Sequence, residues 1–358
     1  MKSVEGLKCL ESSWEYLKET KLPIFIYGMG DGCLKLIREF NSYRIPLAGI
    51  FASDEFVRGH SFEGHLVHKL SEIEDTLGCG NFVIALAFAA GYQSLIDKID
   101  DIESRNILLA PDTDVIGVGA FTKELLEENL DKIQLVYDRL ADEYSKQVYI
   151  NVLSFKITGR LDYLRKCTSL PDEAYNNILR LGHCETYVDL GAYTGDTIAE
   201  FLSYTNGRYQ DIYALEPNKR NFKKLTENTK ELHNCHIVNA AAWDKSEILV
   251  FNAGGGRQSQ VSKKGVDTQA ISVDELLAGN KATYIKYDVE GAEKKAIDGA
   301  KNTIEKYKPK LCVALYHRAV DMFELPLQIL SVNTDYKLYI RHYPYYPAWE
   351  TNLFAVCE

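Results

Sequence analysis

Along the first 110 residues, short hydrophobic runs alternate with segments whose apolar residues recur every three or four positions. The runs predict buried strands and the spaced segments predict helices. The expected strands lie at 24–28, 45–53, 81–88 and 106–110. The expected helices lie at 33–43, 71–78, with Ser71 as a candidate cap, and 92–102, after a short amphipathic helix within 1–20. Strands that alternate with helices are typical of a parallel sheet.

The middle of the chain has a different pattern. Gly and Pro are scarce from Thr122 to Leu164, and apolar residues follow one another at helical spacing. These residues are Leu126, Leu130, Ile133, Tyr137, Leu140, Tyr144, Val148 and Val152. We therefore predict a helical connector over 113–180. The pattern leaves open whether its helices pair two subunits of a homo-oligomer or pack against their own domains.

From Glu185 the alternation of strands and helices begins again. Strands are expected at 186–190, 211–215, 235–239, 247–252, 283–289, 309–316, 335–342 and 351–357. Helices are expected at 195–205, 217–231, 292–306 and 320–331. We therefore predict an α/β protein with a smaller N-terminal Rossmann-like domain at 1–112, the connector, and a second α/β domain at 181–358.

Composition and charge exclude several classes of protein. The net charge of −10 argues against a general nucleic-acid-binding protein, which would present a basic face. No apolar signal segment follows Met1, and no apolar run approaches the roughly 18 residues of a membrane span. The eight cysteines form no CxxC pair, and His65 and His68 have no further ligand nearby in the sequence. We expect a cytoplasmic protein with reduced thiols, no membrane span and no metal site.

The stretch VDLGAYTGDT at 188–197 follows a predicted strand and opens a predicted helix. A turn that binds a pyrophosphate usually has the pattern GxGxxG. Here Gly191 and Gly195 are four residues apart, and two acids, Asp189 and Asp196, flank them. Two carboxylates would repel a phosphate and suit a ligand with a cationic end. The ammonium and sulfonium of S-adenosylmethionine (SAM) would be such a ligand, and Gly191 would let the backbone approach it.

The following strands supply further candidates for the same ligand. Glu216 ends the second strand of this domain, where an acid can accept both hydroxyls of a ribose. Small residues after the third strand, including Ala241, leave room for an adenine, and Asp244 could accept from its amino group. The carboxyl ends of parallel strands meet at one edge of a sheet, where open α/β sheets bind ligands.

The fourth strand delivers residues that could take part in a reaction. In ATYIKYDVEGAE at 282–293, Lys286, Asp288 and Glu290 alternate onto one face. His317 follows the fifth strand and would reach the same edge, or it is a histidine buried under the loop. Lys286 would steady the carboxylates, bind an anionic substrate, or merely pair with Glu290. Proton transfer from a hydroxyl acceptor would need one of Asp288, Glu290 and His317.

Several motifs together resemble an FkbM-type methyltransferase over about 185–357. They are VDLGAYTGDT, ALEP, AISVDEL, YIKYDVEGAE, KPKLCVALYHRAVDMFELPLQI and the terminal YKLYIRHY and ETNLFAV, of which KYDVEGAE is the most specific. The resemblance implies a seven-stranded methyltransferase sheet that uses SAM and methylates an oxygen of a small or carbohydrate-like acceptor. By this resemblance the cofactor residues would be Asp189, Gly191, Gly195, Asp196 and Glu216. We add Tyr193, Thr197, Ala241 and Asp244 as further candidates. The catalytic candidates are Lys286, Asp288, Glu290 and His317.

The N-terminal domain has a glycine turn of its own, YGMGDG at 27–32. The glycine that GxGxxG would require at position 33 is Cys33, and Asp54 follows Gly30 by twenty-four residues. The domain is similar to modules that bind nucleotide sugars or CoA, and it also fits a scaffold without a ligand. An alternative function is therefore an NAD-dependent sugar oxidoreductase or epimerase that uses this turn. A third is a non-catalytic assembly module that only binds SAM.

Two other segments leave their roles open. The stretch RHYPYYPAWE at 341–350 carries Tyr343, Tyr345, Tyr346 and Trp349, whose rings would line a sugar pocket or simply cover the core. The Gly-rich and locally basic segment 252–265 would close over a substrate or be disordered.

Overall fold

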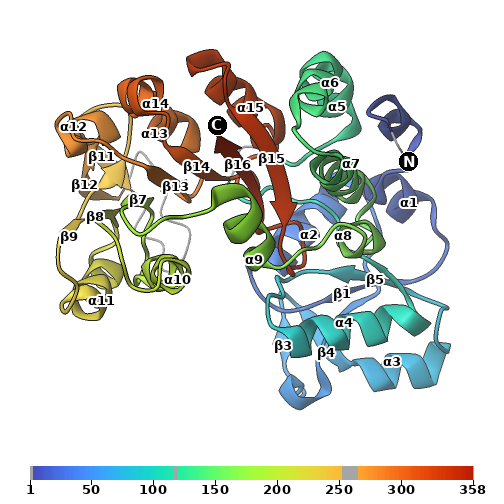
Figure 1. Ribbon diagram of the computed structural model, residues 1–358. Helices are drawn as coiled ribbons and strands as arrows, with labels where there is room; N and C mark the ends of the chain where they lie inside the picture. The colour runs from blue at the N-terminus through green and yellow to red at the C-terminus, as the bar shows by residue number, and fades with distance from the viewer. Residues whose placement is uncertain (1–2, 117–118, 252–264, 358) are drawn as a thin grey trace. The chain divides into compact units, whose positions relative to one another are not determined.

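The computed structural model describes residues 3–116, 119–251 and 265–357. The chain divides into two compact units. The first comprises 1–133, 146–168 and 342–350, and the second comprises 134–145, 169–341 and 351–358. Both units are α/β structures, so the predicted fold class is confirmed (Figure 1).

The first unit is built on a six-stranded sheet of order β3-β4-β2-β1-β5-β6. Its strands are β1 (Ile24–Tyr27), β2 (Gly49–Ala52), β3 (Ser61–Phe62), β4 (His65–Lys69), β5 (Val83–Leu86) and β6 (Ile107–Leu109). β4, β2, β1, β5 and β6 run parallel, and β3 is an antiparallel edge strand that pairs with β4. The parallel sheet was predicted, whereas β3 and β4 were not among the expected strands.

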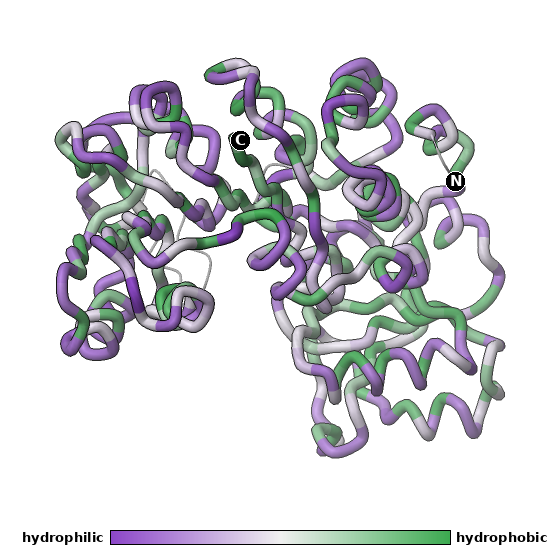
Figure 2. The backbone as a smooth tube through the Cα atoms, viewed as in Figure 1, coloured by the Kyte–Doolittle hydropathy of each residue, from purple (hydrophilic) through white to green (hydrophobic). Residues whose placement is uncertain are grey.

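Helices precede, connect and follow the strands of the first unit along the chain. They are η1 (Glu5–Cys9), α1 (Ser13–Glu19), α2 (Asp31–Tyr43), η2 (Asp54–Phe56), α3 (Leu70–Leu77), α4 (Gln93–Arg105), α5 (Lys123–Glu128) and α8 (Asp162–Arg165). α3 and α4 lie side by side, joined by an ion pair of 2.8 Å between Arg105 and Glu74 (Figure 1). Hydrophobic residues concentrate in the strands, while α3 and α4 alternate between hydrophobic and hydrophilic turns (Figure 2). The helices thus bury one face against the sheet.

Ser71 does not cap α3 as predicted. The helix begins at Leu70 with Lys69 as its N-cap, so Ser71 already lies in the first turn. The side chain that satisfies this end of the helix is Asp54, which accepts hydrogen bonds from Leu70 N at 3.2 Å and Ser71 Oγ at 2.9 Å. A carboxylate is a favourable partner for the exposed N–H groups of a helix start. Asp54 lies sixteen residues before Leu70, so the local sequence around the helix start does not indicate it as a cap.

The second unit is built on a seven-stranded sheet of order β15-β16-β14-β13-β7-β8-β9. Its strands are β7 (Thr186–Leu190), β8 (Asp211–Leu215), β9 (Cys235–Val238), β13 (Tyr284–Tyr287), β14 (Lys310–Ala314), β15 (Lys337–His342) and β16 (Thr351–Val356). β9, β8, β7, β13 and β14 are parallel, and β16 is antiparallel to β14. The predicted seven-stranded sheet is therefore confirmed. A small second sheet contains β10 (Ala241–Ala242), β12 (Val266–Ile271) and β11 (Glu247–Phe251).

Helices of the second unit connect these strands. They are α9 (Pro171–Glu173), the π-helical segment η3 (Ala174–Leu179), α10 (Asp196–Tyr204), α11 (Lys219–Thr229), α12 (Val273–Leu277), α13 (Glu293–Asp298), α14 (Lys301–Tyr307) and α15 (Asp321–Val332). The helix predicted at 292–306 is in fact two helices. They are interrupted at Gly299, where a Cβ atom would lie 2.0 Å from the carbonyl oxygen of Trp243.

The segment predicted as a helical connector is helical. In addition to α5, α8, α9 and η3, it contains α6 (Leu130–Arg139) and α7 (Glu143–Thr158). Its residues 146–168 belong to the first unit, and 134–145 and 169–180 belong to the second. Within the second unit, the buried Arg341 bonds to Asp142 at 2.8 Å and to Glu173 at 2.9 Å. Partly buried ion pairs thus connect Asp142, just before α7, and Glu173, at the end of α9, to β15.

Candidate functional site

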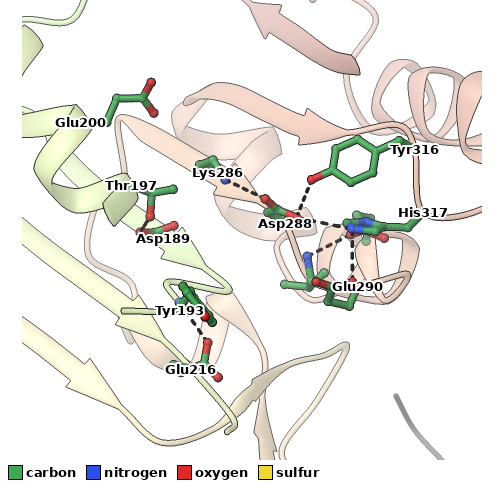
Figure 3. A network of polar contacts seen from close by, with 12 residues as sticks. Asp189, Tyr193, Thr197, Glu200, Glu216, Lys286, Asp288, Glu290, Tyr316 and His317 are labelled. Carbon is green, nitrogen blue, oxygen red and sulfur yellow. Dashed lines mark hydrogen bonds and ion pairs between the residues drawn. The ribbon is translucent and has the colours of Figure 1, made fainter. Parts of the chain in front are cut away.

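The candidate site lies at the carboxyl ends of β7, β8, β13 and β14 in the second unit (Figure 3). Asp189 sits near the end of β7 and is fully buried. Its Oδ2 atom accepts a hydrogen bond from Thr197 Oγ1, which brings the strand and the first turn of α10 together. Among the described residues, its Oδ1 atom has no hydrogen-bond partner. Burial raises the pKa of Asp189 to about 6, against the opposing influence of Lys286 and Thr197.

The turn after β7 needs its glycines for two separate reasons. Gly191 has a φ of 88°, and a Cβ atom there would lie 2.0 Å from the carbonyl oxygen of Asp288. Gly195 has a φ of 91° and is the N-cap of α10. Asp196, the first residue of α10, is exposed and lies where the helix dipole favours a carboxylate. The close neighbour of Gly191 is therefore the end of the next strand in the sheet.

Glu216 follows β8 directly and is held in place by backbone groups. Its carboxylate accepts from Tyr193 N at 3.0 Å and from Asn218 N at 2.8 Å. Burial raises the pKa of Glu216 to about 7, although these two hydrogen bonds act in the opposite direction. The side chain of Tyr193 is partly exposed beside it, on a residue with a φ of 47°. Each carboxylate oxygen can accept a further hydrogen bond, so Glu216 keeps the capacity to bind hydroxyl groups.

The two residues predicted near an adenine lie in and next to the small sheet. Ala241 is buried in β10 and pairs with Ala270 of β12. Asp244 forms an ion pair of 2.5 Å with Lys295 through Oδ2. Its Oδ1 atom is buried and has no hydrogen-bond partner among the described residues. Asp244 therefore retains an acceptor atom, although part of its charge is already paired.

A second group of charges surrounds Asp288, just beyond the end of β13 (Figure 3). Lys286 Nζ lies 3.1 Å from Asp288 Oδ2, and Tyr316 Oη donates to Oδ1 at 3.1 Å. These contacts and the nearby His317 hold the pKa of Asp288 below its usual value, although burial opposes them. Lys286 is also the cross-strand neighbour of Asp189 in the sheet. One lysine thus lies beside both groups of carboxylates.

His317 lies among acids in the loop between β14 and α15 and is 3% exposed. Its Nε2 atom is 3.5 Å from Asp288 Oδ1 and 3.5 Å from Glu290 Oε2. Its Nδ1 atom is 2.8 Å from Glu293 Oε1. The three carboxylates raise the pKa of His317 to about 10, even though burial alone would lower it. The ring is therefore an imidazolium at neutral pH.

The structure thus brings Lys286, Asp288, Glu290 and His317 together as the sequence suggested. It also adds two residues that sequence reasoning missed, Tyr316 and Glu293. Tyr316 immediately precedes His317 and could have been suspected from that position alone. Glu293 belongs to the quoted motif, but no sequence signal indicated that it would meet a residue after the next strand.

The N-terminal glycine turn is tightly packed. A Cβ atom at Gly32 would lie 2.0 Å from the carbonyl oxygen of Ala87, and one at Gly28 would lie 2.8 Å from the ring of Phe88. The carboxylate of Asp54 is occupied by the start of α3. Packing within the first unit therefore explains Gly28, Gly32 and Asp54, whereas a Cβ atom at Gly30 would meet nothing within 4 Å.

The aromatic segment near the C-terminus belongs to the first unit from His342 to Glu350. Tyr346 and Ala90 exchange two backbone hydrogen bonds of 2.7 and 2.9 Å, and the Tyr345 ring fills the space beside Gly91. Arg165 lies over the Tyr346 ring, 5.7 Å from its centre. The segment therefore packs on the loop after β5. The Gly-rich segment 252–265, whose role the sequence left undecided, lies outside the described residues except for Gly265.

The described part of the chain contains no helix that is both long and apolar enough to cross a membrane.

The strand order of the seven-stranded sheet, with acids and a glycine turn at the carboxyl ends of its central strands, is that of a methyltransferase-like α/β domain. Residues 189–341 match the family model of the methyltransferase FkbM domain. The resemblance found in the sequence is therefore confirmed over these residues.

One solved structure is similar over nearly the whole chain. It is the methyltransferase FkbM from Methylobacillus flagellatus KT, with 20% identity, a TM-score of 0.71, and coverage of 93% of this chain and 90% of that one. This likeness supports the fold of both units.

Two further similar structures cover about half of the chain. An rRNA methylase from Streptococcus thermophilus has 10% identity, a TM-score of 0.34, and coverage of 50% of this chain and 90% of its own. Fibrillarin from Aeropyrum pernix, solved with bound S-adenosyl-L-methionine, has 13% identity, a TM-score of 0.32, and coverage of 49% and 67%. Similarities this low carry no argument about function. No curated protein matches the chain.

Proposed function

We propose that this methyltransferase uses SAM and transfers its methyl group to an oxygen of a small, carbohydrate-like acceptor. The observation that carries the proposal is Asp189, whose fully buried carboxylate has one oxygen without a partner among the described residues. A buried carboxylate with an unused acceptor is costly unless a cation or donor meets it. A ligand with a cationic end fits this requirement.

The other residues of the first group fit the same ligand. Asp189, Asp196 and Glu216 would hold the cofactor, with Gly191, Tyr193, Gly195 and Thr197 forming the turn around it. Ala241 and Asp244 would line its adenine end. The acids outnumber the nearby basic groups, which suits a cationic cofactor rather than a phosphate. When bound, SAM supplies an electrophilic methyl group attached to a sulfonium.

The second group would serve the acceptor. Asp288 is ionised at neutral pH because its pKa is lowered, so its carboxylate can accept a hydrogen bond or a proton from a hydroxyl. His317 is already protonated, and it would therefore act as a fixed cation and hydrogen-bond donor rather than as the base. Lys286 would keep Asp288 charged and oriented. Alignment of the acceptor oxygen with the methyl group would provide most of the rate enhancement.

The test is methyl transfer from labelled SAM to a panel of sugars, nucleotide sugars and related hydroxyl compounds. We expect S-adenosylhomocysteine (SAH) to form with at least one acceptor, and Asp288→Asn to lower kcat about 10²–10⁴-fold, the usual contribution of a proton acceptor. SAM binding without transfer to any member of the panel would contradict the acceptor class and favour a module that only binds SAM. The carbohydrate-like acceptor and the cytoplasmic location stay predictions.

A further inference from the structure

Glu293 is a buried acid that the proposed reaction does not use. It is the first residue of α13, and its side chain is fully buried. Its Oε1 atom accepts two hydrogen bonds, from Val289 N at 2.9 Å and from His317 Nδ1 at 2.8 Å. Val289 lies in the loop after β13, and His317 lies in the loop after β14. One oxygen atom therefore joins the two loops that carry the second group of site residues.

The contact between Glu293 and Nδ1 determines the tautomer and the ring orientation of His317. A carboxylate accepts only, so Nδ1 must carry its proton in either protonation state of the ring. The other nitrogen, Nε2, then faces Asp288 and Glu290 at 3.5 Å each. A histidine that is free to turn would not keep both distances. Buried histidines in functional sites commonly owe their tautomer and ring orientation to such a partner.

The contact with Val289 fixes the loop beside it. Val289 stands between Asp288 and Glu290, and Glu290 has a left-handed backbone with a φ of 52°. This conformation is uncommon for a residue with a side chain and needs support from its surroundings. The hydrogen bond from Val289 N to Glu293 restrains the backbone immediately before Glu290. The same acid therefore supports both the histidine and the carboxylates that face it.

The neighbouring acid, Asp321 at the start of α15, plays a different part. It is 1% exposed, and burial together with the charge of Glu293 raises its pKa to about 8. Its Oδ2 atom accepts a hydrogen bond from Arg318 N at 2.9 Å, within the turn that precedes α15. Four acids thus lie around His317, namely Asp288, Glu290, Glu293 and Asp321.

We propose that Glu293 is the positioning residue of this site, which holds His317 with Nε2 toward Asp288 and Glu290 and anchors the loop that carries those two acids. The catalytic consequence of this inference rests on the proposed function. The positions of Glu293, His317 and Val289 do not depend on it. Glu293 would touch neither cofactor nor acceptor and would act through its two hydrogen-bond partners.

The test compares Glu293→Gln with Asp321→Asn in the full-length protein. Glu293→Gln keeps the shape but removes the charge and half of the acceptor capacity. We expect it to lower kcat at least tenfold with SAM affinity changed less than about threefold. Asp321→Asn keeps an oxygen that can accept from Arg318 N and should leave kcat at pH 7 within about twofold.

A second measurement does not depend on activity. This measurement is NMR of ¹⁵N-histidine-labelled protein, in which the signals of His317 are identified because they disappear in His317→Asn. We expect Nδ1 of His317 to be protonated at pH 8 in the wild type. In Glu293→Gln the ring should titrate at clearly lower pH. A wild-type His317 with only Nε2 protonated, or an unchanged titration in Glu293→Gln, would overturn the inference, even if the variant were too unstable for kinetics. Failure of the proposed function would instead appear as absence of turnover in the wild type as well.

Discussion

The carbonyl oxygen of Asp288 lies so close to the backbone of Gly191 that a Cβ atom there would be 2.0 Å away from it. The contact joins the end of β7 to the end of β13, the two neighbouring strands that carry Asp189 and Asp288. The proposed cofactor turn and the candidate catalytic loop are therefore in direct contact. A change in one is expected to disturb the other.

Gly191→Ala should strongly destabilise the second unit. An alanine at a φ of 88° costs about 1–2 kcal/mol, and the collision with the Asp288 carbonyl adds roughly 1–3 kcal/mol. Gly207→Ala is the matched control, because its φ is 71° and no atom of the described residues lies within 4 Å of the new Cβ. Urea unfolding followed by far-UV circular dichroism would compare them. Equal losses of stability in the two variants would refute the close contact.

The charge on His317 should make stability depend on alkaline pH. Its folded pKa of about 10 lies above the ordinary value of 6.5, so its stabilising contribution is complete below about pH 6.5 and is lost as pH rises toward 10. In that window this group alone should reduce the free energy of unfolding by about 1.4 kcal/mol per pH unit. Denaturant unfolding from pH 7 to 9.5 would measure the slope.

The comparison for this slope uses two histidine variants. His317→Asn should remove the corresponding part of the pH dependence. The exposed His233, replaced by Asn, should leave the slope as in the wild type. If His317→Asn and the wild type showed the same dependence of the free energy of unfolding on pH, that result would contradict a buried imidazolium at this position.

Affinity for SAM should rise with pH between about 5 and 8. The pKa of Asp189 is raised to about 6 and that of Glu216 to about 7, so part of each carboxyl is protonated in this range without ligand. A cationic ligand with hydroxyl groups would favour the charged forms, and binding should therefore release protons. Calorimetry in buffers of different ionisation enthalpy would count them. Glu216→Gln should weaken binding and reduce the number released, and proton uptake on binding would show that the sign is wrong.

Much of the architecture followed from local patterns. The bounds of β7 and β8 were predicted to the residue, because each is an apolar run between clear turn signals. Strand ends also located the acids Asp189, Glu216 and Asp288, since parallel strands bring their carboxyl ends to one edge. A site of this kind can therefore be predicted in outline from sequence order alone.

Features that depend on distant partners were missed. β12 pairs with β10 and β11, and Ala270 is its only buried residue, so its sequence lacks a strong strand pattern. The break between α13 and α14 comes from the close approach of the Trp243 backbone to Gly299. Glu293 meets His317 across twenty-four residues of chain. Such contacts arise from tertiary packing, which hydrophobic periodicity does not encode.

The central claim is that the buried acid at the end of β7 belongs to a SAM site. Titration calorimetry with SAM and with SAH at pH 8 tests it most directly, using the wild type, Asp189→Asn, and Asp267→Asn as a control for an exposed acid. We predict that the wild type and Asp267→Asn bind SAM alike and that Asp189→Asn binds at least about tenfold more weakly, the cost of one charge-assisted contact. A folded wild type that binds neither SAM nor SAH would contradict the account.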